Sequence, residues 1–354
     1  MSELDDPTRF LLRAATPQDL DAYERMARAS AVGITTLPAN RSALAERLER
    51  SAQAFASSDD ASGEEIYVFV LEDLAAGALV GTSAITARAG FSDRFYSYRN
   101  EMVVHTSAAL ETTQRIHTLH LCHDLSGHTL LSSFYIDPAY EDTLAPQLLS
   151  RARLLFIGEF ADRFSDRIAS ESPGLADDSG RCPFWDAVGR RFFEMDYASA
   201  ERLAGGRHKA FIAELMPQAP IYVPLLPDEA QWAIGQLHPV AELPFSILLD
   251  EGFDTETYVD IFDGGPTVDA RVAMLKTVRA SRRRVLAEAE PAGSAAAGLH
   301  LVANTQRSAW RALLAPAALH GPELALNPAQ VTRLQTRVGQ SLRAAPLQEA
   351  ETIE

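Results

Sequence analysis

Apolar runs of strand length alternate with apolar residues at helical spacing along the first 160 residues. The pattern predicts strands at residues 10–14, 66–71, 79–85 and 130–136, with a hairpin turn at 75–77 joining the second and third. Thr16 followed by Pro17 is typical of a helix start, and apolar spacing predicts further helices over 42–55 and 146–160. This order of elements predicts an α+β fold in which helices flank a mixed sheet.

The second part of the chain has weaker patterns and changes in composition near residue 287. We expect helices over residues 184–193 and 227–237, and a strand over 258–262. Residues 287–298 are small and flexible, as in a linker or long loop, and a helix start at Asn327-Pro328 follows. We therefore expect a core over 1–286, divisible into halves at about 1–160 and 161–286, and a small β-rich region over 299–354.

Composition and charge exclude several classes of protein. The 354 residues carry 32 Lys and Arg against 48 Asp and Glu, and the net charge of −16 disfavours nucleic acid and anionic membranes as partners. No apolar stretch approaches the roughly 18 residues of a membrane span, and the acidic N-terminus lacks the apolar segment of a secretory signal. Cys122 and Cys182 are too few for a disulfide framework, so we expect structural thiols in a cytoplasmic protein.

Four groups of polar residues are candidates for chemistry, and each also has an ordinary structural explanation. On a helix His117, His120 and His123 would share a face, whereas on a strand His120 would point opposite to the others. The apolar residues around them suggest a strand, so we expect structural or surface roles rather than a metal site. Among the acidic residues between 250 and 263, Asp260 is the strongest candidate to bind a cationic substrate, because it interrupts an apolar strand. A tight turn explains residues 264–266 better than a phosphate loop. For the arginines at 279 and 282–284 we expect a salt-bridged surface helix or an anion contact at a subunit interface.

Several stretches together resemble one enzyme family, the arginine and ornithine N-succinyltransferases of the Gcn5-related acyltransferase superfamily. They lie between about residues 10 and 305 and include Tyr67-Val68-Phe69-Val70-Leu71-Glu72-Asp73, Pro183-Phe184-Trp185, Gly189-Arg190-Arg191-Phe192-Phe193, Gly235-Gln236-Leu237-His238-Pro239 and residues 210–217 and 258–267. Residues 95–101 and 121–125 are more similar to the alpha subunit of the two-subunit form. The resemblance implies the acyltransferase fold and a partner, either a homologous beta subunit or further copies of the chain.

The resemblance also implies an activity and the residues that perform it. Succinyl-CoA, a co-substrate rather than a permanently bound cofactor, would donate its succinyl group to the α-amino group of L-arginine or L-ornithine in arginine catabolism. The sheet of such enzymes splays at the strand matching residues 130–137, where Phe134 and Ile136 would contact succinyl-CoA. His238 would protonate the departing thiolate, although a histidine before proline also fits a helix cap.

One segment departs from the superfamily pattern. Residues 140–147, Tyr-Glu-Asp-Thr-Leu-Ala-Pro-Gln, lie where a glycine-containing loop usually holds the CoA pyrophosphate, yet they contain no glycine, two acids and Pro146. In one interpretation CoA binds through the strand and through basic side chains elsewhere, such as Arg151 or Arg153. In another the chain is a non-catalytic structural or regulatory subunit. A third possibility is an acyltransferase with a different acyl donor or amine.

Overall fold

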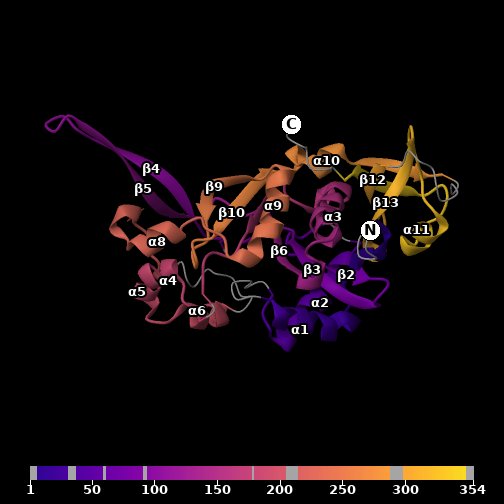
Figure 1. Cartoon of the computed structure of the whole chain (residues 1–354), viewed down its shortest axis with the longest axis horizontal. Coiled ribbons are helices and arrows are strands. Elements are labelled where there is room, and N and C mark those ends of the chain that lie inside the picture. Colours follow the sequence, from indigo (N-terminus) through magenta and orange to yellow (C-terminus); the bar gives the residue numbers. More distant parts are fainter. Residues whose placement is uncertain are drawn as a thin grey trace.

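One continuous sheet runs through the computed structural model, which describes residues 6–30, 37–58, 61–90, 94–177, 179–204, 214–287 and 298–347. Its strand order is β12-β15-β11-β14-β13-β1-β2-β3-β6-β7-β10-β9-β4-β5-β8 (Figure 1). The strands are β1 Phe10–Ala14, β2 Ile66–Asp73, β3 Ala78–Thr86, β4 Ser97–Ser107, β5 Thr112–Cys122, β6 Thr129–Ile136, β7 Arg167–Glu171, β8 Ile221–Tyr222, β9 Asp254–Val259, β10 Pro266–Arg271, β11 Arg282–Leu286, β12 Gly298–Asn304, β13 Arg311–His320, β14 Glu323–Ala325 and β15 Ser341–Pro346. The predicted α+β class is confirmed, because parallel and antiparallel pairs share this sheet and helices pack on it.

The helices cover both faces of the first strands. They are α1 Leu20–Ala29, α2 Arg41–Ala56, α3 Ala145–Glu159, α4 Pro183–Ala187, α5 Arg190–Phe193, α6 Tyr197–Ala204, α8 Asp228–Ala233, α9 Glu242–Glu251, α10 Lys276–Ala280 and α11 Pro328–Arg333. On β2, Val68 and Val70 pack with α1 and α2, whereas Phe69 packs against Phe156 of α3. This alternation follows from the two-residue period of a strand, and it explains why β2 reads as a continuous apolar run. No helix in the described ranges is long and apolar enough to cross a membrane.

The last strands close on themselves. Strands β11 to β15 pair in a ring, because β12 bonds both β15 and β13, and apolar residues such as Val302, Leu313 and Leu342 fill its interior. Strand β13 also pairs with β1, which joins the ring to the main sheet. The β-rich character predicted for 299–354 is therefore present, but the ring already begins at Arg282. Most of the predicted 287–298 linker lies outside the described residues, and the division of the core into halves remains a prediction.

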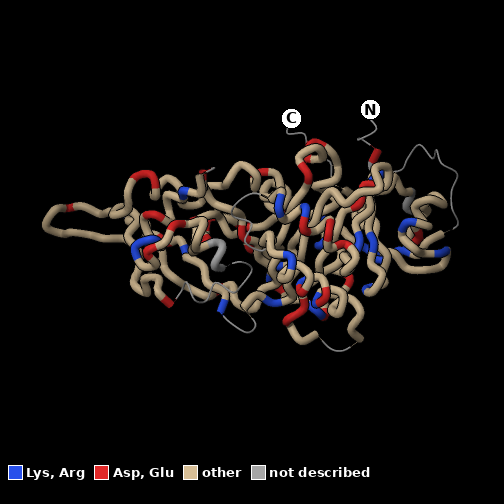
Figure 2. The backbone as a smooth tube through the Cα atoms, turned by 90° about the horizontal axis from the view of Figure 1, so that it is seen from below, with Lys and Arg blue, Asp and Glu red and all other residues tan. Residues whose placement is uncertain are grey.

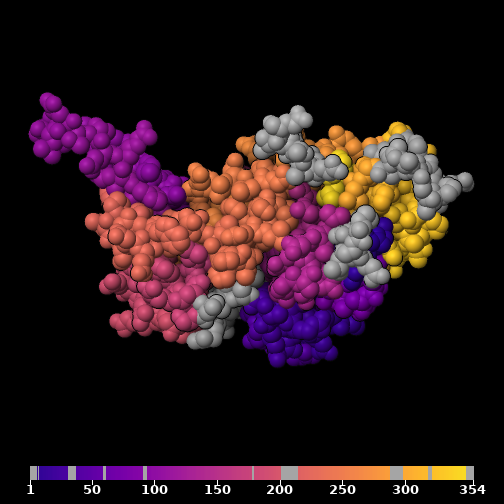
Figure 3. Space-filling model, in the orientation of Figure 1, coloured from indigo at the N-terminus to yellow at the C-terminus, as the bar shows by residue number. Residues whose placement is uncertain are grey.

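A long hairpin of β4 and β5 projects from the body of the molecule, at the upper left of Figures 1 and 3. Its strands pair from Ser97–Cys122 to Ser107–Thr112, and most of its outer part is exposed. The sequence does not predict this hairpin, because its residues lack the alternation that a half-buried strand requires. A two-stranded ribbon without a covering layer is marginally stable in water, so its length calls for a physical explanation.

Three predicted elements differ from the structure in their bounds. The predicted helix at 184–193 is two short helices, α4 and α5, separated at Gly189, where a Cβ would lie 2.2 Å from the Trp185 ring. The predicted helix at 227–237 ends at Ala233, near Gly235 in the left-handed region at φ +73°. The predicted strand at 258–262 ends at Val259, because the Asp260 carboxylate accepts the Phe262 amide (2.6 Å) and closes a turn.

Candidate active site

The sheet opens between β6 and β7 near the middle of the molecule. The two strands run parallel and pair only from Thr129–Ile168 to Leu131–Ser170. Beyond that point β6 stays with β3 as far as Ile136, while β7 stays with β10 as far as Glu171. The strands therefore diverge, and the splay expected at residues 130–137 is present.

A bulge in β6 marks the start of this opening. Ser132 pairs with Ala84 and Tyr135 pairs with Thr82, so Ser133 and Phe134 together face one residue of β3. Ser133 adopts a left-handed backbone conformation (φ 54°), and Arg47 of α2 donates a hydrogen bond to its hydroxyl (3.0 Å). A non-glycine residue in this region is strained by roughly 1–3 kcal/mol, and such bulges redirect side chains near functional sites.

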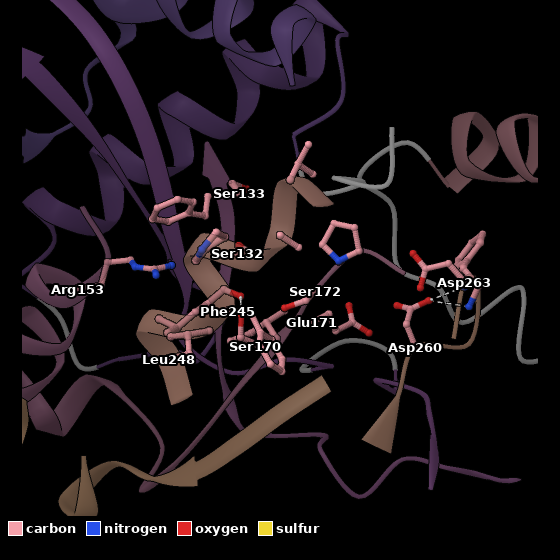
Figure 4. Close-up of a pocket in the computed structure, with 18 of the residues that line it drawn as sticks. Ser132, Ser133, Arg153, Ser170, Glu171, Ser172, Phe245, Leu248, Asp260 and Asp263 are labelled. Atoms are coloured by element: carbon pink, nitrogen blue, oxygen red, sulfur yellow. Dashed lines mark hydrogen bonds between the residues drawn. The ribbon is translucent and has the colours of Figure 1, made fainter. Parts of the chain in front are cut away.

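The opening contains a cavity of about 880 Å³, part of it open solvent. Figure 4 shows residues from β6, β7, α3, α9 and the turn after β9 around it. Its lining residues are Leu130, Leu131, Ser132, Ser133, Phe134, Arg153, Ser170, Glu171, Ser172, Pro173, Tyr197, Val240, Ala241, Pro244, Phe245, Leu248, Asp260, Phe262 and Asp263. A mostly apolar cleft with a few charged groups is typical of a small-molecule site.

Arg153 of α3 is the buried cation of this cavity. The residue is only 2% exposed, and its guanidinium carbon lies 5.6 Å from the centre of the Phe134 ring. Its Nε and one Nη donate to the carbonyl and hydroxyl of Ser150 (3.2 and 3.1 Å). Burial lowers the pKa of the Arg153 guanidinium to about 9. No carboxylate among the described residues forms an ion pair with it.

Three carboxylates gather on the opposite side of the cavity from Arg153 (Figure 4). Glu171 ends β7, and Asp260 and Asp263 belong to the turn after β9; both aspartates are 4% exposed. Asp263 accepts hydrogen bonds from the Gly174 amide (2.9 Å) and the Tyr197 hydroxyl (3.3 Å). Asp260 therefore lines the cavity, and it also holds the turn that positions Asp263.

Close backbone packing fixes this turn. A Cβ on Gly265 would lie 2.3 Å from the Ser172 carbonyl oxygen, and Gly264 has φ +69°. Only glycine fits both positions. The predicted structural role of residues 264–266 is confirmed.

His238 and Ile136 lie differently with respect to the cavity. The His238 amide donates to the carbonyl of the lining residue Pro173 (2.9 Å), and its Nδ1 accepts the Val240 amide (3.4 Å). It caps the short helix that follows rather than the helix before it, and its half-buried ring is not among the lining residues named above. Ile136 is buried in the core and packs closely against Gly81: a Cβ added to that glycine would lie 3.0 Å from the Ile136 Cδ1. Phe134 packs against the same core cluster that contains Ile136, so the two share a face of β6. Ile136 is not among the lining residues, and its contact with succinyl-CoA stays a prediction.

Several backbone amides of the 140–147 segment are bonded within the segment or to the residues just before it. The Tyr140, Thr143 and Ala145 amides donate to Asp137, Tyr140 and Thr143 (2.8, 3.2 and 3.1 Å). Both acids of this segment, at positions 141 and 142, are exposed. The segment therefore lacks the open row of amides that usually holds a pyrophosphate.

Arg151, the other arginine considered for CoA, is already ion-paired. It forms salt bridges with Asp250 and Glu251 of α9, and Glu251 also accepts from the Thr277 amide (2.8 Å) and hydroxyl (2.6 Å). Its charge is satisfied inside the fold. Of the two arginines, only Arg153 faces the cavity.

The remaining candidates have structural roles. His117 contacts Asn100, whereas His120 lies 3.4 Å from Glu101, and the described residues contain no group of three metal-binding side chains. Both cysteines are free, and burial raises the pKa of each thiol. Arg283 of the arginine cluster pairs with Glu159 (2.7 Å). The expected surface helix is wrong for Arg282, Arg283 and Arg284, because these residues pair with β15 as strand β11; of the cluster, Arg279 alone lies on a helix, α10.

The sequence did not point to Glu171 or to the α9 residues of the cavity. Asp263 was among the acidic candidates but ranked below Asp260, and Arg153 was considered only as a CoA contact. A signal for Arg153 was present, because residues 148–157 are apolar around the whole helix except at Ser150 and two arginines. A charge on a helix buried on all sides needs a partner or a ligand. Glu171 follows a short, unremarkable strand and offered no such signal.

Comparisons with known proteins agree with this geometry. The family model described as arginine N-succinyltransferase beta subunit matches residues 10–277, and that of its C-terminal domain matches 282–346. The chain is 46% identical to arginine N-succinyltransferase subunit alpha of Pseudomonas aeruginosa over 307 residues, covering 86% of this chain and 90% of the relative. It is 40% identical to subunit beta of the same organism over 338 residues, covering 96% and 98%.

A solved structure gives the same result. It is described as arginine/ornithine succinyltransferase subunit AI from Pseudomonas aeruginosa, is 41% identical and has a TM-score of 0.88, with 97% of this chain and 100% of that chain covered. Relatives named alpha and relatives named beta both match, so the comparisons identify the family rather than the subunit type. With the cavity in the splayed sheet, they establish an N-acyltransferase: the chain belongs to the arginine N-succinyltransferase family.

Proposed function

We propose that this chain transfers the succinyl group of succinyl-CoA to the α-amino group of L-arginine or L-ornithine, as an alpha-type subunit in arginine catabolism. The observation that carries the proposal is the cavity between β6 and β7, which offers an acyl chain an apolar wall and a charged group at each side. The higher identity to the relative named alpha, 46% against 40%, supports the subunit type.

The proposed reaction is a direct transfer. The uncharged amine nitrogen attacks the thioester carbonyl carbon, a C–N bond forms, and the C–S bond then breaks to release the CoA thiolate. The backbone at Phe134, beyond the end of pairing with β7, would stabilise the negative charge on the carbonyl oxygen. Phe134 is thus the proposed succinyl-CoA contact.

His238 is the proposed proton donor to the thiolate. The donating form is the imidazolium, which gives one ring proton to the thiolate and becomes the neutral ring. In that neutral ring Nδ1 is free to accept the Val240 amide, as it does in the structure. The bond from its amide to Pro173 fixes the histidine next to the cavity wall. Glu171 is the proposed acceptor for the proton that the attacking amine must lose.

The acidic side of the cavity is the proposed site of the amine substrate. Arginine and ornithine each carry a second positive group, and carboxylates such as Asp260 and Asp263 complement it. Within this turn the Phe262 amide donates to Asp260 and the Gly265 amide donates to Asp263, so both positions are fixed before substrate binds. Preorganised charges bind without a further ordering cost.

The β4–β5 hairpin supports a proposal that the chain works with a homologous subunit or with copies of itself. Met102, Val104 and Leu110 are exposed on it, and Glu111 is the one Asp, Glu, Lys or Arg residue between positions 102 and 114, as the mostly tan tube of Figure 2 shows. A projecting ribbon of this kind gains stability when another chain covers it. Light scattering of the chain, alone and mixed with a sister subunit, checks this: a Met102→Glu, Val104→Glu variant should dissociate, and an unchanged mass would contradict the role of the hairpin.

A non-catalytic subunit is the second candidate, and the 140–147 segment is the observation that favours it. Several of its amides are used internally and its acids would repel a pyrophosphate. In this alternative, the chain supports a catalytic sister subunit and does not bind succinyl-CoA.

Thiol release from succinyl-CoA, with L-arginine or L-ornithine as acceptor, separates the two. The chain is assayed alone and with a sister subunit, as wild type, as His238→Ala, and as His123→Ala, a matched control at an exposed histidine. Catalysis by this chain predicts a loss of about 100-fold or more in kcat for His238→Ala and none for the control. Equal activity of all three, or calorimetry that detects no binding of succinyl-CoA, would contradict it.

A further inference from the structure

A buried guanidinium faces the cavity, and no carboxylate in the described part of the chain pairs with it. Arg153 is 2% exposed and contacts the carbonyl and hydroxyl of Ser150 and the face of the Phe134 ring. These neutral groups orient the guanidinium but do not neutralise its positive charge. A buried cation is costly unless an anion accompanies it, so the site suits a ligand that brings a negative charge.

The depth of Arg153 decides which anion this is. A CoA pyrophosphate stays at the protein surface, whereas Arg153 lies inside on α3, beneath the place where β6 and β7 part. A group that reaches it must enter the cavity, and the acyl end of a thioester is the part that does so. The anion is therefore on the acyl group.

The surroundings of Arg153 fit a short chain with a carboxylate at its end. Phe245 and Leu248 of α9 and Phe134 of β6 form apolar walls on which methylene groups can pack. Phe134 belongs to the bulge proposed to hold the thioester carbonyl, and its ring lies 5.6 Å from the guanidinium carbon. The carbonyl and the far end of the acyl chain can thus be held within a few ångströms of each other.

We propose that Arg153 binds the free carboxylate of a dicarboxylic acyl group and thereby selects succinyl over uncharged acyl donors. This role rests on the proposed succinyl transfer and identifies the residue that recognises the acyl group of the donor. It also explains how the cavity keeps its two substrates apart. The anionic donor binds on the Arg153 side, and the cationic amine binds beside Glu171, Asp260 and Asp263 (Figure 4).

A donor panel tests this assignment. Wild type, Arg153→Met and Arg50→Met are assayed with L-arginine and with succinyl-CoA or butyryl-CoA, which carries a methyl group where succinyl carries its carboxylate. Arg50 is a matched control, because it is an exposed arginine that donates to the Glu64 carbonyl (3.3 Å) and does not line the cavity. Wild type and Arg50→Met should prefer succinyl-CoA by at least about 100-fold in kcat/KM.

Arg153→Met should reverse most of that preference. We expect its kcat/KM for succinyl-CoA to fall about 100- to 1,000-fold, with that for butyryl-CoA unchanged or higher and the KM for L-arginine within about threefold of wild type. Retained butyryl transfer also shows that the variant is folded. If Arg153→Met is insoluble, Arg153→Lys replaces it and should lose part of the preference, since an ammonium lacks the planar fork.

Each result bears on a different claim. No succinyl transfer by wild type, alone or with a sister subunit, would overturn the proposed function. Succinyl transfer by wild type with equal use of butyryl-CoA would overturn the role of Arg153, as would an unchanged donor ratio in Arg153→Met or Arg153→Lys.

Discussion

Helix α3 carries two buried arginines, two residues apart, with opposite surroundings. Arg151 is enclosed by Asp250 and Glu251 of α9, and Glu251 is held in turn by Thr277. Arg153 has Ser150 and the Phe134 ring for neighbours and faces the cavity. A guanidinium whose charge the fold neutralises serves stability, whereas one whose anion must come from outside serves binding.

Removal of each arginine should therefore have opposite effects on stability. Arg151→Met leaves Glu251, which is fully buried, without its cation, and it should lower the free energy of unfolding by about 3–5 kcal/mol. Arg153→Met removes a desolvated charge and should change that free energy by less than about 1 kcal/mol, or raise it. Urea denaturation of the two variants measures the free energies of unfolding. Equal destabilisation would contradict the assignment of Arg151 to stability and Arg153 to binding.

The Arg9–Asp73 pair extends the comparison to acid pH. Hydrogen bonds from Arg9 (2.6 Å), opposed by burial, lower the pKa of the fully buried Asp73 from 3.8 to about 2. A lowered pKa in the folded state means that the unfolded chain binds the proton first. The stabilisation, about 2 kcal/mol, is then complete above pH 4 and is lost as the pH falls toward 2.

Asp73→Asn checks this behaviour. The difference in unfolding free energy between wild type and the variant should shrink between pH 5 and pH 2.5, and the exposed control Asp142→Asn should show little difference at either pH. A difference independent of pH would mean that the pair does not stabilise the fold through charge.

Free succinate should produce the smallest effect. A dicarboxylate that binds the folded chain at ten times its Kd stabilises it by about 1.4 kcal/mol, which raises the melting temperature slightly. The shift should be absent in Arg153→Met and present in Arg50→Met. Thermal denaturation with succinate and with butyrate measures it, and an equal shift with both acids would show that the carboxylate near Arg153 is not recognised.

The parts of the fold that the sequence predicted are those with strong local patterns. Strands β2 and β3 were expected from their apolar runs and α3 from its spacing, and all three are present. Helix α9 was missed because Pro244 and a run of large apolar residues obscure its period, and β7 is too short to give one. The exposed β4–β5 hairpin has neither pattern, since no core face constrains its side chains.

The candidate site was predictable only in part, for a related reason. The motif resemblance pointed to Phe134, and a charge within an apolar stretch pointed to Asp260; both line the cavity. The different surroundings of Arg151 and Arg153 depend on the packing of α9. Asp250 and Glu251 of that helix pair with Arg151, whereas its Leu248 lines the cavity together with Arg153. Such contacts join residues about 100 positions apart, and no local pattern encodes them.

A crystal structure of the chain with succinyl-CoA, in the absence of amine, tests the central claim most directly. The account predicts the thioester carbonyl beside Phe134 in the β6–β7 opening and the succinyl carboxylate at about 3 Å from the Arg153 guanidinium nitrogens. An acyl group bound outside the opening, or a carboxylate turned toward Asp260 and away from Arg153, would contradict it.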